Sequence, residues 1–235
     1  MGRVTFYSEN HMIFGNFDLP YEKAPCIICL HGLESSKDSR KWLAFTSRLY
    51  DEGYACLRFN SRGCGEGLEK SEGQFENTNL TVRIKEYRSS LDFLNNEQKV
   101  EISRLGVVGS SFGGLVAIAA KDKRVKVIVT LASPYKIPIF KKPIIHKEVK
   151  RIKKSFYEDL KRYDLLNAAE DSPPLLIIHG DSDATVPLEH AYRLFEAASE
   201  PKRLEVIEEA DHIFSKPQHL KKVIDLTLEW FKKHL

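Results

Sequence analysis

Apolar residues in this chain gather in short runs that alternate with stretches of helical spacing. The runs that predict buried strands are 26–30, 55–59, 104–108, 126–131, 175–180 and 203–207. Between them, apolar residues three or four apart predict helices, as in Trp42, Phe45 and Leu49 or Tyr87, Leu91 and Leu94. Strands that alternate with helices predict an α/β fold with a mostly parallel central sheet and helices on both faces. A binding site in such a sheet forms at the carboxyl ends of the strands.

The two ends of the chain fit the same domain. Alternating apolar residues in 4–7 and 12–17 predict an opening hairpin around Glu9-Asn10. Helical spacing returns in 115–120, in 188–198 and in a closing helix marked by Leu220, Ile224, Leu228, Phe231 and Leu235. A chain of 235 residues suits one α/β domain with a sizeable core, so we predict a single domain over 1–235.

The segment 134–171 is longer than the one helix that a plain crossover needs. Its apolar residues fall on one helical face: Val149, Ile152, Phe156, Leu160 and Tyr163. We predict a small lid over the catalytic edge, inserted after the strand that follows the 115–120 helix. An ordinary crossover helix with solvated lysines is the alternative. In the lid interpretation, the aromatic residues Phe140, Phe156 and Tyr157 wall a substrate pocket.

Ser111 lies in the stretch Gly109-Ser110-Ser111-Phe112-Gly113, between the 104–108 strand and the 115–120 helix. A serine on a tight strand-to-helix turn is exposed at the carboxyl edge of the sheet, and glycines flank it because a β-carbon there would clash. The serine hydroxyl is a poor nucleophile at neutral pH, so it needs a base, and the base needs an acceptor that fixes its tautomer. We predict that Ser111 is a nucleophile.

Candidates for the base and its acceptor follow two later strands. The strand 175–180 runs into Asp181 and Asp183, and the strand 203–207 leads to His212. Serine, aspartate and histidine therefore come in this order, each just past the carboxyl end of a strand. This order is typical of α/β-hydrolases and differs from the orders in the two other large serine-hydrolase folds.

The other histidines have simpler interpretations. His179 precedes the glycine that ends its strand and is predicted to be packed in the core, while His190 and His219 lie in predicted helices. His31 is expected to shape the loop after its strand. These assignments leave His212 as the predicted base, with Asp183 and Asp181 as alternative acids.

Several motifs together resemble one family. They are His31-Gly32-Leu33, Arg62-Gly63-Cys64-Gly65, the segment 71–77, the turn around Ser111, His179-Gly180-Asp181-Ser182-Asp183, Val186-Pro187 and Ala210-Asp211-His212. Along essentially its whole length, the chain resembles the α/β-hydrolases. Among these it is most similar to the small cinnamoyl- or feruloyl-esterase-like and serine-aminopeptidase-like enzymes.

This resemblance implies roles for further residues. By the family's spacing the acid is Asp183, and the backbone N–H groups of Leu33 and Phe112 form the oxyanion hole. No metal and no organic cofactor are implied. Two positions depart from the family pattern, since Asn60 stands where many relatives carry aspartate and Ser110 where histidine is common. Both departures bear on substrate preference more than on the reaction.

Composition and charge limit the kinds of partner that we expect for this chain. The net charge is only +3, from 36 basic and 33 acidic residues, so we expect no nucleic-acid partner. No apolar run approaches the ~20 residues that span a bilayer, and the first residues lack a signal-peptide pattern, so we expect a cytoplasmic protein without a membrane partner. Four cysteines suggest free thiols, and Cys26 and Cys29 point to opposite faces of one strand.

Together these features predict a carboxylesterase that acts on a small-molecule ester, with a short-chain or an aryl or hydroxycinnamoyl acyl group. A peptidase or a thioesterase could use the same residues, because these reactions share a tetrahedral intermediate. A ligand-binding protein without catalysis is the alternative from another class, since a fold does not fix a function.

Overall fold

The computed structural model describes residues 2–137 and 152–235. Within this part of the chain, one sheet of eight strands has the order β1-β2-β4-β3-β5-β6-β7-β8. The strands are β1 Gly2–Ser8, β2 His11–Asp18, β3 Ala24–Leu30, β4 Ala55–Phe59, β5 Val100–Ser110, β6 Val125–Leu131, β7 Leu175–Gly180 and β8 Lys202–Ile207. From β4 to β8 all neighbours pair in parallel, and β2 is antiparallel to both of its neighbours. The predicted mostly parallel α/β sheet is confirmed.

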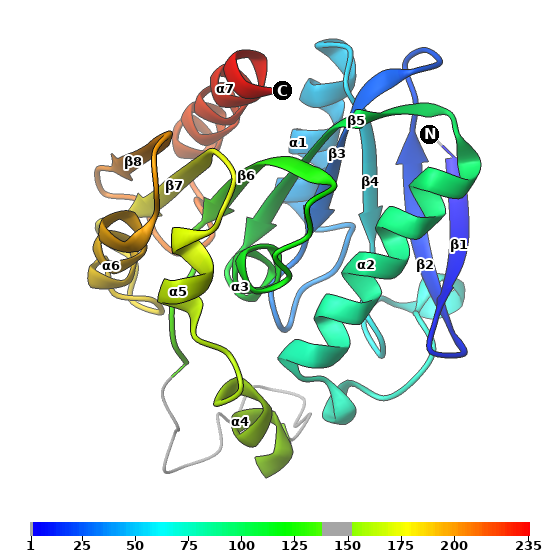
Figure 1. The fold of residues 1–235 in the computed structure, drawn as a ribbon, viewed down its shortest axis with the longest axis horizontal. Coiled ribbons are helices and arrows are strands. Elements are labelled where there is room, and N and C mark those ends of the chain that lie inside the picture. The colour runs from blue at the N-terminus through cyan, green and yellow to red at the C-terminus, as the bar shows by residue number, and fades with distance from the viewer. Residues whose placement is uncertain (1, 138–151) are drawn as a thin grey trace.

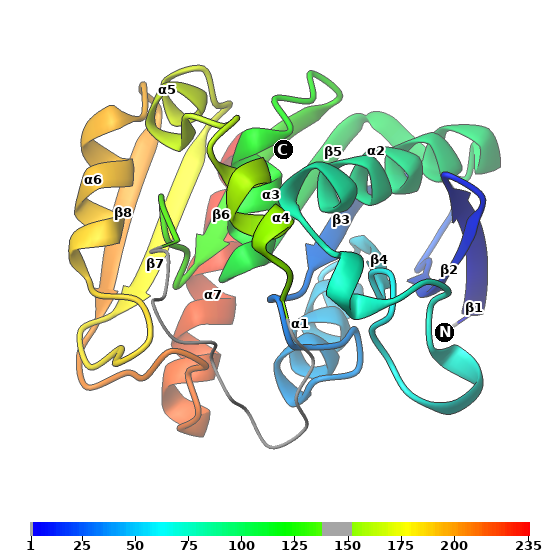
Figure 2. The same cartoon turned by 90° about the horizontal axis from the view of Figure 1, so that it is seen from below.

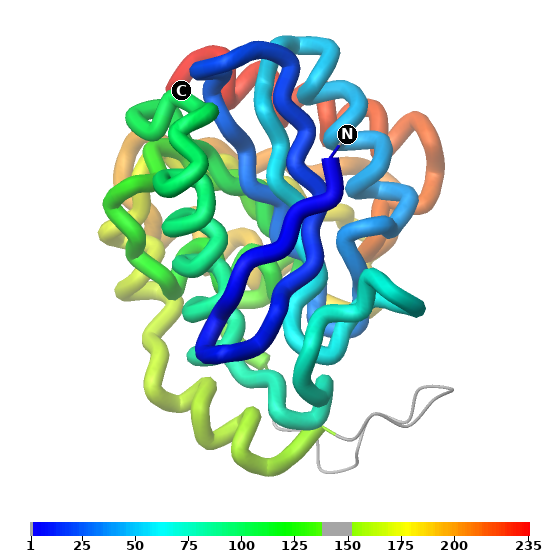
Figure 3. Tube along the Cα trace, turned by 90° about the vertical axis from the view of Figure 1, so that its right-hand side faces the viewer, coloured from blue at the N-terminus to red at the C-terminus, as the bar shows by residue number. Residues whose placement is uncertain are grey.

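The predicted hairpin of β1 and β2 forms one edge of the sheet, which faces the viewer in Figure 3. Glu9 and Asn10 have φ angles of 47° and 64°, the left-handed conformation that a two-residue turn with the twist of the strands requires. The turn sets the register by pairing Ser8 with His11, and this buries Phe6 and Ile13 on the same face of the sheet.

Helices cover both faces of the sheet (Figures 1 and 2). The α-helices are α1 Arg40–Asp51, α2 Leu80–Glu97, α3 Phe112–Ala119, α4 Lys154–Leu160, α5 Leu165–Glu170, α6 Glu189–Ala197 and α7 Pro217–His234, with short 3-10 helices η1 Gly67–Glu69 and η2 Phe75–Asn77. One core packs α1 and α7 against the sheet, and the other packs α2, α3, α5 and α6. Cys26 lies in the second core and Cys29 in the first, so the two thiols face opposite sides as predicted.

The segment 134–171 contains two short helices in its described part. The predicted apolar face runs to Tyr163, but α4 ends at Leu160, because the Asp164 side chain accepts hydrogen bonds from the first turn of α5 and starts a new helix. Val149 lies outside the described residues. The arrowheads of β3 and β4 point toward the side of the molecule where α4 lies, at the bottom of Figure 1.

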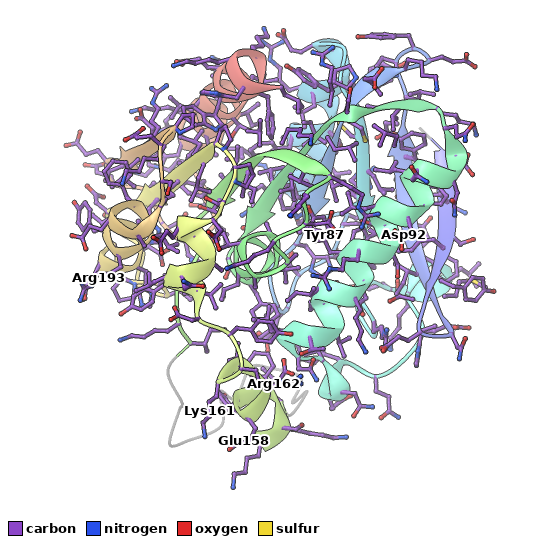
Figure 4. The ribbon with its side chains drawn as sticks, viewed as in Figure 1. Tyr87, Asp92, Glu158, Lys161, Arg162 and Arg193 are labelled. Atoms are coloured by element: carbon purple, nitrogen blue, oxygen red, sulfur yellow. The ribbon has the colours of Figure 1, made fainter. Side chains whose placement is uncertain are left out.

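One carboxylate fixes α4 to the start of α2. Asp159 accepts hydrogen bonds from the backbone N–H and the hydroxyl of Thr81, at 2.9 and 2.6 Å, and the Tyr163 hydroxyl lies 2.6 Å from the same hydroxyl. Glu158 and Lys161 project from the outer side of the segment (Figure 4). A polar anchor thus holds α4 and the residues after it against the start of α2.

Candidate active site

Ser111 lies between the last residue of the central strand β5 and the first residue of α3. Its backbone has φ 54° and ψ −119°, a region that L-residues rarely adopt and that costs about 1–3 kcal/mol. Neighbouring strand ends hold the turn: the Ser111 N–H donates to the Leu131 carbonyl at 2.8 Å, and the Ser133 hydroxyl donates to the Ser111 carbonyl at 3.0 Å. The chain is therefore forced into the sharp turn that presents the Ser111 side chain.

Two glycines make this turn possible, as the sequence predicted. A β-carbon on Gly109 would lie 2.4 Å from the Gly113 carbonyl oxygen, and one on Gly113 would lie 2.1 Å from the Leu30 carbonyl oxygen. Both contacts are with backbone atoms, which cannot move aside. The close approach of α3 to β3 and β5 therefore depends on glycine at both positions.

The three side chains predicted to act together form one chain of hydrogen bonds. His212 Nε2 lies 3.1 Å from Ser111 Oγ, and His212 Nδ1 lies 2.7 Å from Asp183 Oδ2. Ser111 follows β5, Asp183 follows β7 and His212 follows β8, so the parallel sheet brings together residues that are far apart in sequence.

Asp183 is held as a carboxylate. Its side chain is fully buried, and burial alone would raise its pKa. Hydrogen bonds from His179, His212 and the Val186 N–H outweigh burial and hold the pKa of Asp183 well below its usual range. Because the ionised carboxylate only accepts, His212 carries its proton on Nδ1, and its Nε2 is free to accept the proton of the Ser111 hydroxyl.

Asp181, the alternative acid, takes no part in this chain of hydrogen bonds. Its side chain is exposed and accepts a hydrogen bond from the neighbouring Ser182 hydroxyl at 3.1 Å. His190 lies beside Tyr135, whose N–H donates to its ring at 3.2 Å. The geometry thus favours Asp183 over Asp181.

The loop after β3 lies against Ser111. A β-carbon on Gly32 would be 3.4 Å from Ser111 Cβ. The next residue is Leu33, whose N–H donates to no group in residues 2–137 and 152–235. Phe112 begins α3, and N–H groups in the first turn of a helix have no partner within it. Two backbone donors are therefore available on either side of Ser111.

His31 fixes the direction of the Leu33 N–H, and Arg83 holds the peptide unit that follows Leu33. His31 Nε2 accepts from the Ser61 N–H at 3.0 Å, so Nδ1 carries the proton and donates to the Gly32 carbonyl at 2.6 Å. That carbonyl and the Leu33 N–H belong to one planar peptide unit, so the bond sets where the N–H points. Arg83 donates to the Leu33 carbonyl at 3.0 Å and lies 6.0 Å from the Phe112 ring centre.

Comparison with known proteins places the chain in a family. The sequence profile of the prolyl oligopeptidase family matches residues 41–235, which is most of the chain. The chain belongs to the prolyl oligopeptidase family. Its quorum-quenching relative AidA from Acinetobacter baumannii is 31% identical over 109 residues, which cover 45% of this chain and 34% of AidA. The chain thus spans about a third of the length of AidA.

Two solved structures share the fold of this family member. Est1E from Butyrivibrio proteoclasticus, solved with ferulic acid bound, has a TM-score of 0.85 at 20% identity and covers 97% of this chain and 99% of its own. The esterase domain of a Rhodothermus marinus protein has a TM-score of 0.78 at 24% identity, with 99% and 98% covered. The predicted α/β-hydrolase fold is confirmed.

The three predicted pocket residues have different surroundings in this member of the prolyl oligopeptidase family. Phe140 lies outside the described residues. Phe156 is only 1% exposed and packs its ring 5.5 Å from the ring of Phe112. Tyr157 is half-buried and meets Phe156 edge to face at 5.3 Å. Phe156 therefore packs against Phe112, the residue that follows Ser111.

Sequence reasoning missed two contacts at the site. His179, predicted to be packed, is buried, but its Nε2 also lies 3.3 Å from Asp183 Oδ2. Lys41 on α1 donates to the Ser110 hydroxyl at 2.6 Å, and burial lowers its pKa to about 8 despite the nearby carboxylates of Asp211 and Asp183. The spacing of His179 four residues before Asp183 was visible in the sequence, whereas nothing there linked Lys41 to Ser110.

Over residues 2–137 and 152–235, no three His, Cys, Asp or Glu side chains are grouped so that they could hold a metal ion. In the same ranges, no helix has both the length and the apolar character needed to cross a membrane.

Buried His31 is expected to make stability depend on pH. Burial and the nearby Arg83 charge lower its pKa to about 3, against about 6.5 in an unfolded chain. Between these values the unfolded chain binds a proton that the folded protein does not, so stability is lost as the pH falls below 6.5. At pH 5 the loss from His31 is about 2 kcal/mol.

Urea unfolding at pH 7 and pH 5 measures this loss. In His31→Gln the fall in unfolding free energy between the two pH values should be smaller by about 2 kcal/mol than in the wild type. The absolute stability of the variant does not matter, because each protein is compared with itself. Equal falls in the two proteins would contradict the assignment.

Proposed function

We propose that this protein hydrolyses carboxylic esters through an acyl-enzyme formed on Ser111. The observation that carries the proposal is the unbroken run of hydrogen bonds from Asp183 through His212 to the Ser111 hydroxyl. A buried, ionised carboxylate, a histidine in the matching tautomer and a hydroxyl on a strained turn are the parts that nucleophilic catalysis by serine requires.

In the proposed reaction, His212 Nε2 takes the proton of Ser111 as Oγ bonds to the ester carbonyl carbon. The tetrahedral intermediate then expels the alcohol, which leaves with the proton from His212. Water, activated in the same way by His212, attacks the acyl-enzyme, and the acid product leaves as Ser111 regains its proton. Asp183 stabilises the imidazolium that forms twice in each cycle.

Negative charge develops on the carbonyl oxygen in both steps. We assign its stabilisation to the N–H groups of Leu33 and Phe112, which flank Ser111 and have no competing acceptor among the described residues. Each donor of this kind is typically worth ~3 kcal/mol in the transition state. Before the substrate arrives, His31 holds the peptide unit that carries the Leu33 N–H, and Arg83 holds the next unit along the chain.

Aryl and hydroxycinnamoyl esters are the proposed preferred substrates. Est1E, which shares the fold, was solved with ferulic acid, a hydroxycinnamate, and the Rhodothermus marinus protein is described as an esterase domain. On α4, the aromatic residue Phe156 packs against Phe112, and Tyr157 packs against Phe156. In this proposal residues 134–171 form the lid that covers the acyl group.

Steady-state kinetics on 4-nitrophenyl esters test the proposal, because every substrate then has the same leaving group. We expect kcat/KM for the ferulate ester to exceed that for the butyrate ester by about tenfold or more. Equal or inverted values would remove the aryl preference while leaving an esterase.

The same assays separate the alternatives. The family also contains peptidases by name, so faster cleavage of aminoacyl anilides than of every ester would favour a peptidase. Faster cleavage of acyl-CoA would favour a thioesterase. Folded protein that turns over none of these compounds would favour a ligand-binding protein on this fold.

A further inference from the structure

A second histidine contacts Asp183, the acid of the proposed triad of Ser111, His212 and Asp183. His179 is the last residue but one of β7, and its side chain is fully buried. Its Nε2 lies 2.8 Å from the Val186 carbonyl oxygen and 3.3 Å from Asp183 Oδ2. A carbonyl oxygen can only accept, so Nε2 carries the proton of this ring and donates it to the Val186 carbonyl, with the Asp183 carboxylate beside the same N–H.

The carboxylate of Asp183 therefore receives four N–H groups. Oδ1 accepts from the backbone N–H groups of Thr185 and Val186, both at 2.8 Å, which stop the carboxylate from rotating. Oδ2 is shared between His212 at 2.7 Å and His179 at 3.3 Å. His179 is thus the one ring, among the described residues, that competes with His212 for the same oxygen.

We infer that His179 is a positioning residue that holds Asp183 Oδ2 in line with His212 and withdraws part of its negative charge. This inference rests on the proposed function, because it concerns the acid of that triad. An N–H bonded to a carboxylate oxygen stabilises its charge, so the oxygen holds a second proton donor less strongly. With His179 present, Asp183 Oδ2 stays in line with His212 while part of its negative charge is shared with a second N–H.

Packing alone does not explain a histidine at position 179. Its Nδ1 is buried and has no hydrogen-bond partner in the described residues, and an unpaired buried acceptor destabilises the folded state. An aliphatic side chain would fill the same space without this penalty. The contact with Asp183 supplies a reason for a ring at this position.

Other ionisable groups lie near the pair. Lys41 from α1, His190 from α6 and His212 from the loop after β8 interact with Asp183, and His190 also interacts with His179. Further out, Asp211 interacts with Lys41, and Lys136 and Glu189 interact with His190. All of them are unchanged when residue 179 alone is substituted. A difference between two variants at this position therefore reports the N–H of residue 179 and not the surrounding field.

The variants His179→Gln and His179→Met form a matched pair, because both side chains are unbranched and similar in size, and only glutamine donates a hydrogen bond. We expect the Gln variant to keep the kcat/KM of the wild type within about threefold, with the same pH profile. The Met variant should lose about tenfold in kcat/KM, as expected for one lost bond to a charged group. In the Met variant, the acidic limb of the plot of kcat/KM against pH should move to higher pH, because Asp183 then interacts more strongly with the imidazolium form of His212.

Two outcomes would overturn the inference. Met and Gln variants with the same rate and pH profile would reduce His179 to packing, while the activity of the wild type would leave the proposed function intact. If the Met variant does not fold, ¹⁵N NMR of the wild-type histidines decides, since His179 must carry its proton on Nε2 and a proton on Nδ1 refutes the inference.

Failure of the proposed function has a different signature. In that case the wild type turns over no ester, anilide or thioester. The role of His179 is then tested by the downfield NMR resonance of the proton between His212 and Asp183, because this measurement needs no substrate. Its titration midpoint should rise in the Met variant and stay unchanged in the Gln variant, and equal midpoints in all three proteins refute the inference.

Discussion

Replacement of Ser111 by alanine is expected to lower kcat for 4-nitrophenyl esters by about 10⁶-fold, the size of loss found when the nucleophile of a serine triad is removed. Without Oγ no acyl-enzyme forms, and only the backbone donors and substrate binding remain to assist water. The same variant should lose covalent labelling by a fluorophosphonate probe, which reacts with an activated serine. Rates from stopped assays and intact-protein mass spectrometry measure the two effects.

Ser110→Ala provides the matched control. Ser110 stands next to Ser111 on the same turn, but its hydroxyl bonds to Lys41 and not to His212. We expect this variant to be labelled normally and to keep kcat within about tenfold of the wild type, since one hydrogen bond between protein groups is lost. Labelling that survives in Ser111→Ala but disappears in Ser110→Ala would exchange the roles of the two serines.

Asp183→Asn is expected to lower kcat by about 10⁴-fold, as an aspartate-to-asparagine change in a serine triad does when geometry is kept. The N–H groups of Thr185 and Val186 point at Oδ1, so an asparagine must place its oxygen there and its NH₂ group toward His212. His212 Nδ1 then has to accept, which moves the ring proton to Nε2. In that tautomer His212 cannot take the proton of Ser111.

Asp181→Asn tests whether the effect belongs to the right carboxylate. Asp181 is exposed and lies only two residues away, so this variant changes the same charge in the same loop without touching His212. It should keep kcat within about threefold, since a solvated surface charge interacts weakly. The proposed triad fails if Asp181→Asn abolishes turnover and Asp183→Asn leaves it unchanged.

The sequence pattern predicted the sheet well where strands are fully buried. The strands 55–59 and 175–180 coincide with β4 and β7, because every residue in each is buried and the apolar run has clear ends. The strand predicted over 104–108 actually begins at Val100 in β5. Its early part carries Glu101 and Ser103, which bond to each other at the surface, so hydrophobicity gives no signal there.

The same reasoning explains which site residues could be predicted. Ser111, Asp183 and His212 each follow a predicted strand, and parallel strands deliver their carboxyl ends to one edge whatever lies between them in sequence. The contacts of His179 and Lys41 depend instead on which way a side chain turns inside the core. That direction is set by packing between distant elements, and periodicity along one element does not contain it.

The backbone at position 111 limits which nucleophiles this fold could ever use. Threonine carries the same hydroxyl as serine and performs the same chemistry elsewhere, yet its second Cβ substituent makes a positive φ of this kind far more strained. Unbranched side chains such as those of cysteine or aspartate bring no such added strain. The turn therefore restricts the evolution of its own catalyst by shape, before reactivity is considered.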